Sequence, residues 1–243
     1  MSRTAAALVI GNEILSGKTQ ERNLLALARV LRELGIDLKR VVVVTDDVAT
    51  IAKEVTALAS AHDFVFTSGG VGPTHDDVTM SGIASAFDVP VVPDPTLEDM
   101  LRRHFGERIN DSHLRLALVP EGAQLLSKPD SLWPVTIVEN VWILPGIPEV
   151  FRRKLDIARE HLGGDAPYLS RAVYTNLDEA DLAPMLNVVV QKHPGVDVGS
   201  YPASSDRKYR TKLTFDGKDA TAIGRALDAF LALLPEGEPQ WTE

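Results

Sequence analysis

Residues 67–79 read Thr-Ser-Gly-Gly-Val-Gly-Pro-Thr-His-Asp-Asp-Val-Thr, and this stretch decides the fold class of the chain. It continues residues 63–67, Asp-Phe-Val-Phe-Thr, which are predicted to form a third strand. The three glycines let backbone N–H groups approach an anion closely, and Ser68 and Thr74 add hydroxyl donors. A helix is expected to begin near Thr79, and the positive end of its dipole also favours negative charge. The stretch therefore predicts a phosphate-binding loop that joins a strand to a helix.

The segments before this loop alternate between strand and helix patterns. Residues 5–10 and 41–44 are continuous apolar runs, as expected for buried parallel strands. Residues 24–34 and 51–59 carry apolar side chains at helical spacing. The order of strand, helix, strand, helix, strand and glycine loop predicts an open α/β sheet with right-handed crossovers.

The alternation continues after the loop and then restarts in a smaller unit. The elements expected first are a helix at 79–87, a strand at 89–92, a helix opened by Asp94-Pro95, a hairpin of strands at 136–138 and 141–144, and a helix at 148–162. Residues 165–167 are typical of a linker, and a β-α-β-β-α order follows: a strand at 169–174, a helix at 178–191, strands at 196–201 and 209–215, and a helix at 220–234. We therefore expect an α/β domain at residues 1–164 and a small α+β domain at 168–243.

Composition excludes several classes of protein. The 243 residues are 44% hydrophobic and carry a formal net charge of −9, with no dense block of Lys or Arg. A disordered chain and a general nucleic-acid-binding surface are therefore not expected. The absence of cysteine excludes disulfides, thiolate catalysis and cysteine-ligated zinc. No stretch approaches the length of a signal peptide core or a membrane span, so a soluble, cytoplasmic protein without a membrane partner is expected.

Carboxylates accompany the glycine loop. Asp76 and Asp77 belong to it, Asp46 follows the second strand, and Glu13 follows the first. Because ligands bind beyond the carboxyl ends of parallel strands, these side chains are expected near one site. Carboxylates repel a phosphate unless a divalent cation lies between them. The pattern therefore predicts a metal held by Asp46, Asp76 and Asp77, with Glu13 as a further oxygen ligand.

Less specific interpretations of the same residues stay open. Asp76 or Asp77 can instead cap the helix that begins near Thr79, and Asp47 is expected to be a cap rather than a ligand. Residues 16–19, Ser-Gly-Lys-Thr, resemble the end of a P-loop, but the required glycine is replaced by Asn12, so we exclude that motif.

Four linked motifs resemble those of CinA-type proteins. They are Ile-Gly-Asn-Glu-Ile-Leu-Ser-Gly at 10–17, Thr-Asp-Asp at 45–47, the glycine loop at 68–79 and Leu-Pro-Gly-Ile-Pro at 144–148. The CinA domain is similar to the molybdopterin-binding fold of MogA and MoaB, so the resemblance implies a three-layer α/β/α domain with a mainly parallel sheet. The second unit resembles the small domain that follows this fold in CinA and, more closely, the molybdopterin-binding-like half of eukaryotic FAD synthases.

The resemblance implies a class of reaction. CinA-type relatives are associated with metal-dependent hydrolysis of ADP-ribose and related dinucleotide pyrophosphates, including FAD. Mg²⁺, Mn²⁺ or Co²⁺ is the cofactor so implied, and K⁺ is a second candidate. MogA-type relatives instead adenylylate molybdopterin, which is the first alternative, with a pterin as ligand. A non-catalytic nucleotide-binding module is the second. The relatives form dimers or trimers, so a homodimer is expected.

The resemblance also assigns roles to residues. Asp46 and Asp77 match catalytically important Asp residues of MogA-like proteins. For metal-dependent hydrolysis at this site, we expect Glu13 or Asp76 to be the general base. The usual Gly-Asp-Glu after the first strand is Gly-Asn-Glu here, so Asn12 replaces one potential charged ligand. The residues expected to bind phosphate or nucleotide in the first domain are Asn12, Ser68, Gly69, Gly70, Gly72, Thr74, Pro145 and Gly146.

A basic segment lies between the two middle strands of the second domain. Residues 204–210 read Ser-Ser-Asp-Arg-Lys-Tyr-Arg. Such loops are usually solvated and carry charge for solubility. The functional interpretation is that Arg207 and Arg210 bind the second phosphate, since a guanidinium donates two parallel hydrogen bonds to it.

Overall fold

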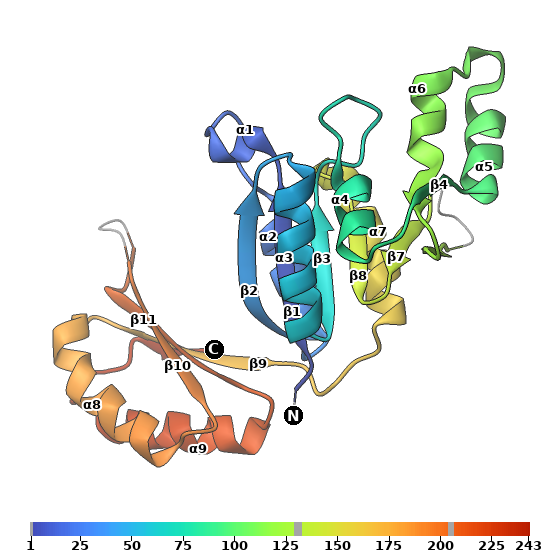
Figure 1. Ribbon diagram of the computed structural model, residues 1–243. Coiled ribbons are helices and arrows are strands. Elements are labelled where there is room, and N and C mark those ends of the chain that lie inside the picture. Colours follow the sequence, from blue (N-terminus) through green and yellow to red (C-terminus); the bar gives the residue numbers. More distant parts are fainter. Residues whose placement is uncertain (1, 129–132, 204–206) are drawn as a thin grey trace. The chain divides into compact units, whose positions relative to one another are not determined.

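A six-stranded sheet forms the centre of the first unit (Figure 1). The computed structural model describes residues 2–128, 133–203 and 207–243, and the chain divides into two units, Met1–Asp165 and Ala166–Glu243. The strands of the central sheet are β1 (Thr4–Ile10), β2 (Asp37–Val44), β3 (Phe64–Ser68), β6 (Gln124–Leu126), β7 (Val135–Val138) and β8 (Val141–Leu144). Their order is β2-β1-β3-β8-β7-β6. The first four are parallel, whereas β7 and β6 run antiparallel to their neighbours.

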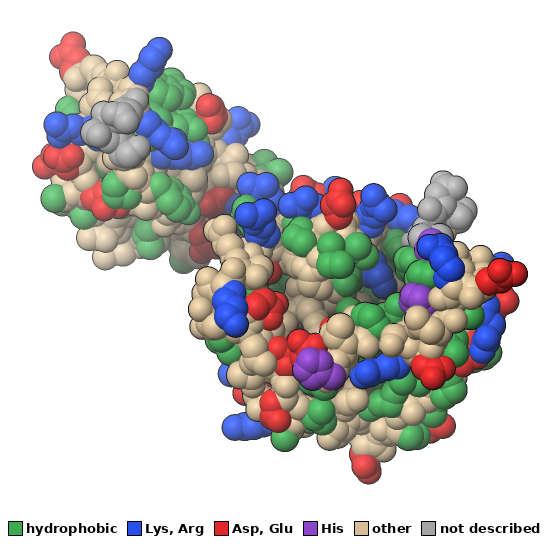
Figure 2. Space-filling view, turned by 90° about the horizontal axis from the view of Figure 1, so that it is seen from above, with side chains coloured by type: hydrophobic (Ala, Val, Ile, Leu, Met, Phe, Trp, Pro, Cys, Tyr) green, Lys and Arg blue, Asp and Glu red, His purple; other side chains and the backbone are tan. Residues whose placement is uncertain are grey.

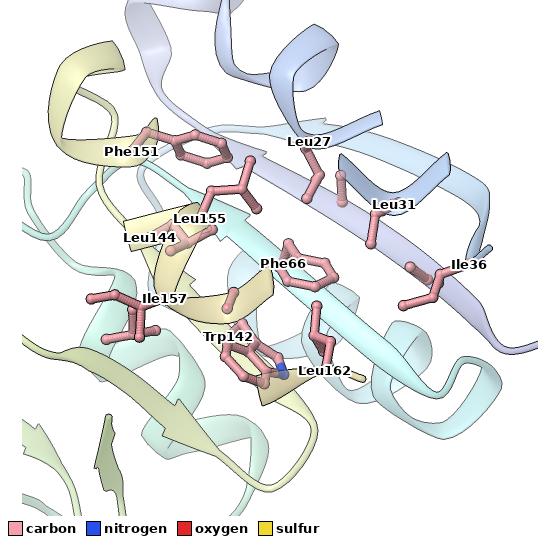
Figure 3. Packing of buried hydrophobic residues seen from close by; sticks show 14 of the residues in the cluster. Leu27, Leu31, Ile36, Phe66, Trp142, Leu144, Phe151, Leu155, Ile157 and Leu162 are labelled. Carbon is pink, nitrogen blue, oxygen red and sulfur yellow. The ribbon is translucent and has the colours of Figure 1, made fainter. Parts of the chain in front are cut away.

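Helices cover both faces of this sheet. They are α2 (Asn23–Glu33) and α7 (Pro148–His161) on one face, and α3 (Val48–Ala61) and α4 (Thr79–Ala86) on the other. On the first face, Leu27 and Leu31 of α2 and Phe151 of α7 pack with Phe66 and Trp142 of the sheet (Figure 3). On the second face, Ile51 and Val55 of α3 and Ile83 of α4 belong to one buried cluster with the alternate residues of β1. The three-layer α/β/α fold and its mainly parallel sheet are therefore confirmed.

A smaller layer extends the first unit beyond the central sheet. It consists of α5 (Pro95–Phe105), α6 (Asp111–Leu114) and the antiparallel pair of β4 (Val91–Pro93) and β5 (Leu118–Pro120). The strand expected at 89–92 thus does not join the central sheet. Leu97 and Leu101 of α5 pack with Val119 and with the side chain of Trp133. This layer forms one wall of the cavity described below.

The second unit is an antiparallel sheet with two helices. The strands β9 (Leu169–Thr175), β10 (Asp197–Pro202), β11 (Thr211–Gly217) and β12 (Trp241–Thr242) lie in the order β10-β11-β9-β12. The helices α8 (Glu179–Lys192) and α9 (Ala220–Leu231) pack through Leu182, Ile223 and Phe230 against Leu213 and Phe215 of β11. The small α+β domain is confirmed, and β12 is an addition to the expected elements. No helix among the described residues has the length and hydrophobicity needed to cross a membrane.

Candidate functional site

Loops after three adjacent strands meet at the carboxyl edge of the central sheet. The strand neighbours β1, β3 and β8 are followed by residues 11–15, by the glycine loop at 69–78 and by residues 145–147. The first of these segments contains the short helix α1 (Asn12–Leu15). Figure 2 views the molecule from this side and shows the first unit hollowed there. The edge is where an open α/β sheet binds its ligands.

The glycine loop has a backbone conformation that residues with a Cβ atom cannot adopt without strain or a steric clash. Gly69 has φ of +108°, and a Cβ there would lie 2.1 Å from the carbonyl oxygen of Ile10. Gly70 has φ of +64°, and a Cβ there would lie 2.3 Å from the hydroxyl of Thr79. That hydroxyl donates to the Gly69 carbonyl at 2.8 Å, and the Thr79 N–H donates to the Gly70 carbonyl at 3.0 Å. Thr79, which is fully buried, thus fixes the loop onto the start of α4.

The loop leaves several backbone donors available. The Gly69 N–H is used by the carbonyl of Leu144, at 3.2 Å. None of the described residues accepts a hydrogen bond from the N–H groups of Gly70, Val71 and Gly72. Consecutive free N–H groups in such a turn form a concave site for an anion. The loop therefore has the chemistry of a phosphate-binding site.

Asp76 and Asp77 converge on one hydroxyl and do not cap α4. The N-cap of α4 is Val78, with no side-chain hydrogen bond, so the capping interpretation of these two carboxylates is wrong. Asp77 instead accepts the Thr74 N–H at 2.8 Å and also lies at hydrogen-bond distance from the Thr74 hydroxyl. The same hydroxyl lies 2.6 Å from the carboxylate of Asp76, and the hydrogen bond lowers the pKa of Asp76. One hydroxyl has one proton, so it cannot satisfy both carboxylates, and a cation beside them would relieve the remaining repulsion.

Asp46 follows β2 and lies beside the start of α1. Its carboxylate accepts the backbone N–H of Asn12 at 2.8 Å. The carboxylate of Glu13 folds back over Gly11, where a Cβ would lie 2.5 Å from Glu13 Oε1. Asp47 caps α3 through the Thr50 N–H, as expected. Glu13 and Asp77 line one cavity together, whereas Asp46 does not line it.

The carboxylates do not form a complete protein cage for a metal. In residues 2–128, 133–203 and 207–243, no cluster of three or more His, Cys, Asp or Glu side chains is close enough to hold an ion. Asp76 and Asp77 are nevertheless exposed or half-buried oxygen donors that share one hydroxyl. Mg²⁺ usually binds through one or two carboxylates together with phosphate oxygens of the substrate. The donor set fits a cation that binds with the ligand.

The cavity beside the glycine loop has a polar end and an apolar end. Its volume is about 630 Å³, within the usual range for small-molecule sites. Gly69, Gly70, Gly72, Pro145 and Gly146 line the polar end, together with Glu13 and Asp77. Met80, Leu97, Leu101, Leu116, Trp133, Ile143 and Val150 line the rest. Figure 2 shows hydrophobic side chains inside this hollow and charged side chains around it. Such a cavity suits a ligand with a phosphate and a large weakly polar group.

Lys154 of α7 is a cavity residue that the sequence analysis missed. It lines the same cavity as Asp77, and its ammonium donates to the carbonyl of Pro134 at 2.6 Å. Burial lowers the pKa of Lys154 to about 8, because the charged form is poorly solvated there. In sequence it follows Arg152 and Arg153, which gives the appearance of an exposed basic run.

We expect the lowered pKa of Lys154 to make the stability of the fold depend on pH. The unfolded chain keeps this proton up to a pKa near 10.5, whereas the folded chain loses it near 8. The buried charge of Lys154 therefore lowers the free energy of unfolding in full below pH 8, and this effect disappears as the pH rises toward 10.5. Lys154→Met should stabilise the protein at pH 7 by up to about 3 kcal/mol, at 1.36 kcal/mol per pKa unit, and by much less at pH 10. Urea unfolding of both proteins at several pH values measures this difference, and a constant difference across pH would contradict the assignment.

Asn23 joins the two loops at the edge of the site. It is 4% exposed, and its amide donates to the Ser68 hydroxyl at 2.9 Å and to the Gly146 carbonyl at 2.8 Å. Ser68 is thus engaged in holding Asn23. Both residues line a second cavity of about 450 Å³ on the other side of Gly69. Nothing in the periodicity of α2 marks Asn23, since it is the first residue of the helix.

We expect Asn23→Asp to destabilise the fold by about 2 kcal/mol, because it removes two donors and places a carboxylate against a buried carbonyl oxygen. Chemical denaturation at neutral pH measures the effect. Asn12→Asp is the matched control, since Asn12 is exposed. Equal stability of the two variants would show that the two hydrogen bonds donated by Asn23 do not contribute to the stability of the fold.

The basic residues of the second unit contact their own unit. Arg210 forms an ion pair with Asp178 at 3.1 Å, and Arg207 lies over the ring of Tyr209 and donates to its hydroxyl. These residues line a separate cavity of about 730 Å³. Residues 204–206 of the same segment lie outside the described residues. The role of Arg207 and Arg210 toward a second phosphate stays a prediction.

The chain belongs to the family of the probable molybdopterin binding domain, whose model matches residues 6–162. Residues 167–242 match the model of the FAD synthase middle domain. Together with the CinA relatives described next, these matches confirm the resemblance to CinA-type proteins and FAD synthases.

The chain is also similar to individual proteins named as FAD synthase or CinA. A probable FAD synthase of Caenorhabditis briggsae is 34% identical over 259 residues, covering 96% of this chain and 50% of that protein. A CinA-like protein of Desulfosudis oleivorans is 32% identical over 159 residues, covering 63% of this chain and 38% of its own length. The crystal structure of CinA from Thermoplasma acidophilum matches with a TM-score of 0.61 and 28% identity, covering 66% of this chain and 98% of that one. The chain spans about half the length of the FAD synthase relatives that it matches.

Proposed function

We propose that the protein is a metal-dependent pyrophosphatase that hydrolyses the phosphoric anhydride of a nucleotide derivative such as ADP-ribose or FAD. The observation that carries the proposal is the cavity that joins free backbone donors of the glycine loop, two carboxylates and an apolar wall. The relation to proteins named FAD synthase agrees with it, because FAD contains a diphosphate between two large planar groups.

The glycine loop binds and orients one phosphate. Its N–H groups at Gly70, Val71 and Gly72 donate to phosphate oxygens, and α4 begins close behind them, at Thr79. Fixed donors of this kind stabilise the negative charge of a phosphoryl transition state without reorganisation. Leu97, Leu101 and Trp133 enclose the uncharged part of the ligand and exclude water from it.

The carboxylates divide into two roles. Asp76 and Asp77 hold the divalent cation, Mg²⁺, Mn²⁺ or Co²⁺, while Asp46 fixes the loop that carries Glu13 by binding the Asn12 N–H. When bound, the cation supplies charge neutralisation at the phosphate and lowers the pKa of water. Glu13 accepts the proton of the attacking water, because it lines the cavity whereas Asp76 does not.

The experiment is a panel of ADP-ribose, FAD and NADH, each with Mg²⁺, Mn²⁺ or Co²⁺. Products are treated with a phosphatase, and released phosphate is measured. We expect release from at least one substrate and none without metal. Tight binding without release would contradict the hydrolase and support a non-catalytic nucleotide-binding module.

A second candidate function is adenylyl transfer to a pterin. The match to the probable molybdopterin binding domain over residues 6–162 favours it, and the apolar part of the cavity suits a planar heterocycle. ATP consumption that depends on added molybdopterin, in the absence of dinucleotide hydrolysis, would support this function over the first.

A further inference from the structure

Lys154 faces the cavity from a helix whose other side is buried in the core. Val150 and Lys154, four residues apart, both line the cavity. Phe151 and Leu155 of the same helix belong to the core cluster shown in Figure 3. The packing of α7 therefore fixes the backbone position from which Lys154 reaches the cavity, and its side chain is half-buried.

A cation in this position is unusual without an anion. Lysine is almost never fully buried unless it is paired, and even a half-buried charge is poorly solvated where its surroundings are apolar. Within the described residues, no carboxylate lies within ion-pair distance of Lys154, and its ammonium donates to the carbonyl of Pro134. A carbonyl dipole offsets part of the lost hydration but does not neutralise the charge.

The cavity itself supplies the place for that anion. Lys154 and the glycine loop line the same cavity, while Glu13 and Asp77 add negative charge to its rim. The basic segment with Arg207 and Arg210 belongs to the other unit and contacts residues of that unit. Within the first unit, Lys154 is the one basic side chain that lines this cavity among the described residues.

We propose that Lys154 binds the second phosphate of a nucleotide diphosphate whose first phosphate lies at the glycine loop, and that it sets the preference for diphosphates over monophosphates. This inference rests on the proposed function for the ligand class but not on hydrolysis. A lysine acts here as a mobile point charge that can follow either phosphate oxygen. An empty cavity leaves the charge unpaired, and the diphosphate pairs it.

The test compares two ligands that differ by one phosphate. Calorimetry in Mg²⁺ buffer measures the affinity of α,β-methylene-ADP and of AMP for the wild type, Lys154→Met and Arg153→Met. Lys154→Met should bind α,β-methylene-ADP at least tenfold more weakly and AMP less than twofold more weakly. Arg153→Met, an exposed neighbour on α7, should change neither affinity. Equal losses for both ligands, or no loss, would overturn the inference.

A second readout is independent of affinity and of activity. Lysines are methylated with ¹³C-formaldehyde, and the Lys154 signal is the one missing from the spectrum of Lys154→Met. Its pKa should lie near 8 in the free protein and rise by at least one unit with α,β-methylene-ADP. A pKa above 10 in the free protein, or no rise at saturation, would overturn the inference.

The outcomes separate this inference from the proposed function. A wild type that binds α,β-methylene-ADP through Lys154 but hydrolyses no dinucleotide refutes the pyrophosphatase alone. If the wild type hydrolyses a dinucleotide but Lys154→Met binds the diphosphate unchanged, only the proposed role of Lys154 is refuted. A folding defect is checked by thermal melting, since Lys154→Met should melt no lower than the wild type.

Discussion

Asp77→Asn should lower the turnover of the susceptible dinucleotide by roughly a hundredfold or more, in the range observed when a transition-state electrostatic contact is removed. The side chain lines the cavity beside the glycine loop, and its carboxylate is a donor that a divalent cation can use. Asparagine keeps an oxygen that can accept the Thr74 N–H, so the loop should keep its shape. Steady-state kinetics at saturating metal, with thermal melting of both proteins, measure the effect.

The matched control for Asp77 is Asp47. It comes after β2 at the same carboxyl edge of the sheet, caps α3 and does not line the cavity. Asp47→Asn keeps a good capping residue, so both turnover and stability should stay close to those of the wild type. If the turnover of Asp77→Asn stays within a few-fold of that of the wild type, Asp77 has no essential role in the reaction.

Gly69→Ala should destabilise the fold by about 3 kcal/mol or more, because it combines a disfavoured backbone conformation with a steric clash. The added Cβ would lie 2.1 Å from the carbonyl oxygen of Ile10, which is backbone and cannot move aside without displacing β1. Either the variant unfolds or the glycine loop moves. In both cases phosphate binding should be lost.

Gly17→Ala separates the cost of the backbone conformation from the cost of the steric clash. Gly17 has φ of +71° but nothing lies within 4 Å of the position of its Cβ. Only the conformational cost remains, about 1 kcal/mol. Chemical denaturation of both variants measures the difference. Similar stabilities would mean that the close approach of Gly69 to β1 is not what requires glycine.

Local signals in the sequence predicted much of the fold. The glycine loop, the parallel strands before it and the hairpin after it all follow from apolar runs and turn residues. The caps at Asp47 and Asp94 were predictable because an N-cap depends only on the residues that follow within one turn. The cap expected at Asp76 or Asp77 was wrong, since the Thr74 hydroxyl and N–H bind these carboxylates instead.

The residues that were missed depend on distant packing. Lys154 is half-buried because α7 places it beside Pro134, on a cavity that α5 also lines, and sequence periodicity cannot bring these segments together. Asn23 is significant only because Ser68 and Gly146, far away in the chain, meet beside it. Asp46 accepts the Asn12 N–H because β2, the edge strand, is the neighbour of β1, and β1 separates β2 from β3, which the glycine loop follows.

The most direct measurement of the central claim is the ³¹P spectrum of ADP-ribose incubated with the protein and Mg²⁺. The proposed reaction breaks one phosphoric anhydride, so the two diphosphate resonances should disappear and two monophosphate resonances, those of AMP and ribose 5-phosphate, should replace them. Asp77→Asn should leave the spectrum nearly unchanged over the same time. Diphosphate resonances that persist for the wild type with ADP-ribose, and equally with FAD, at saturating metal would contradict the account.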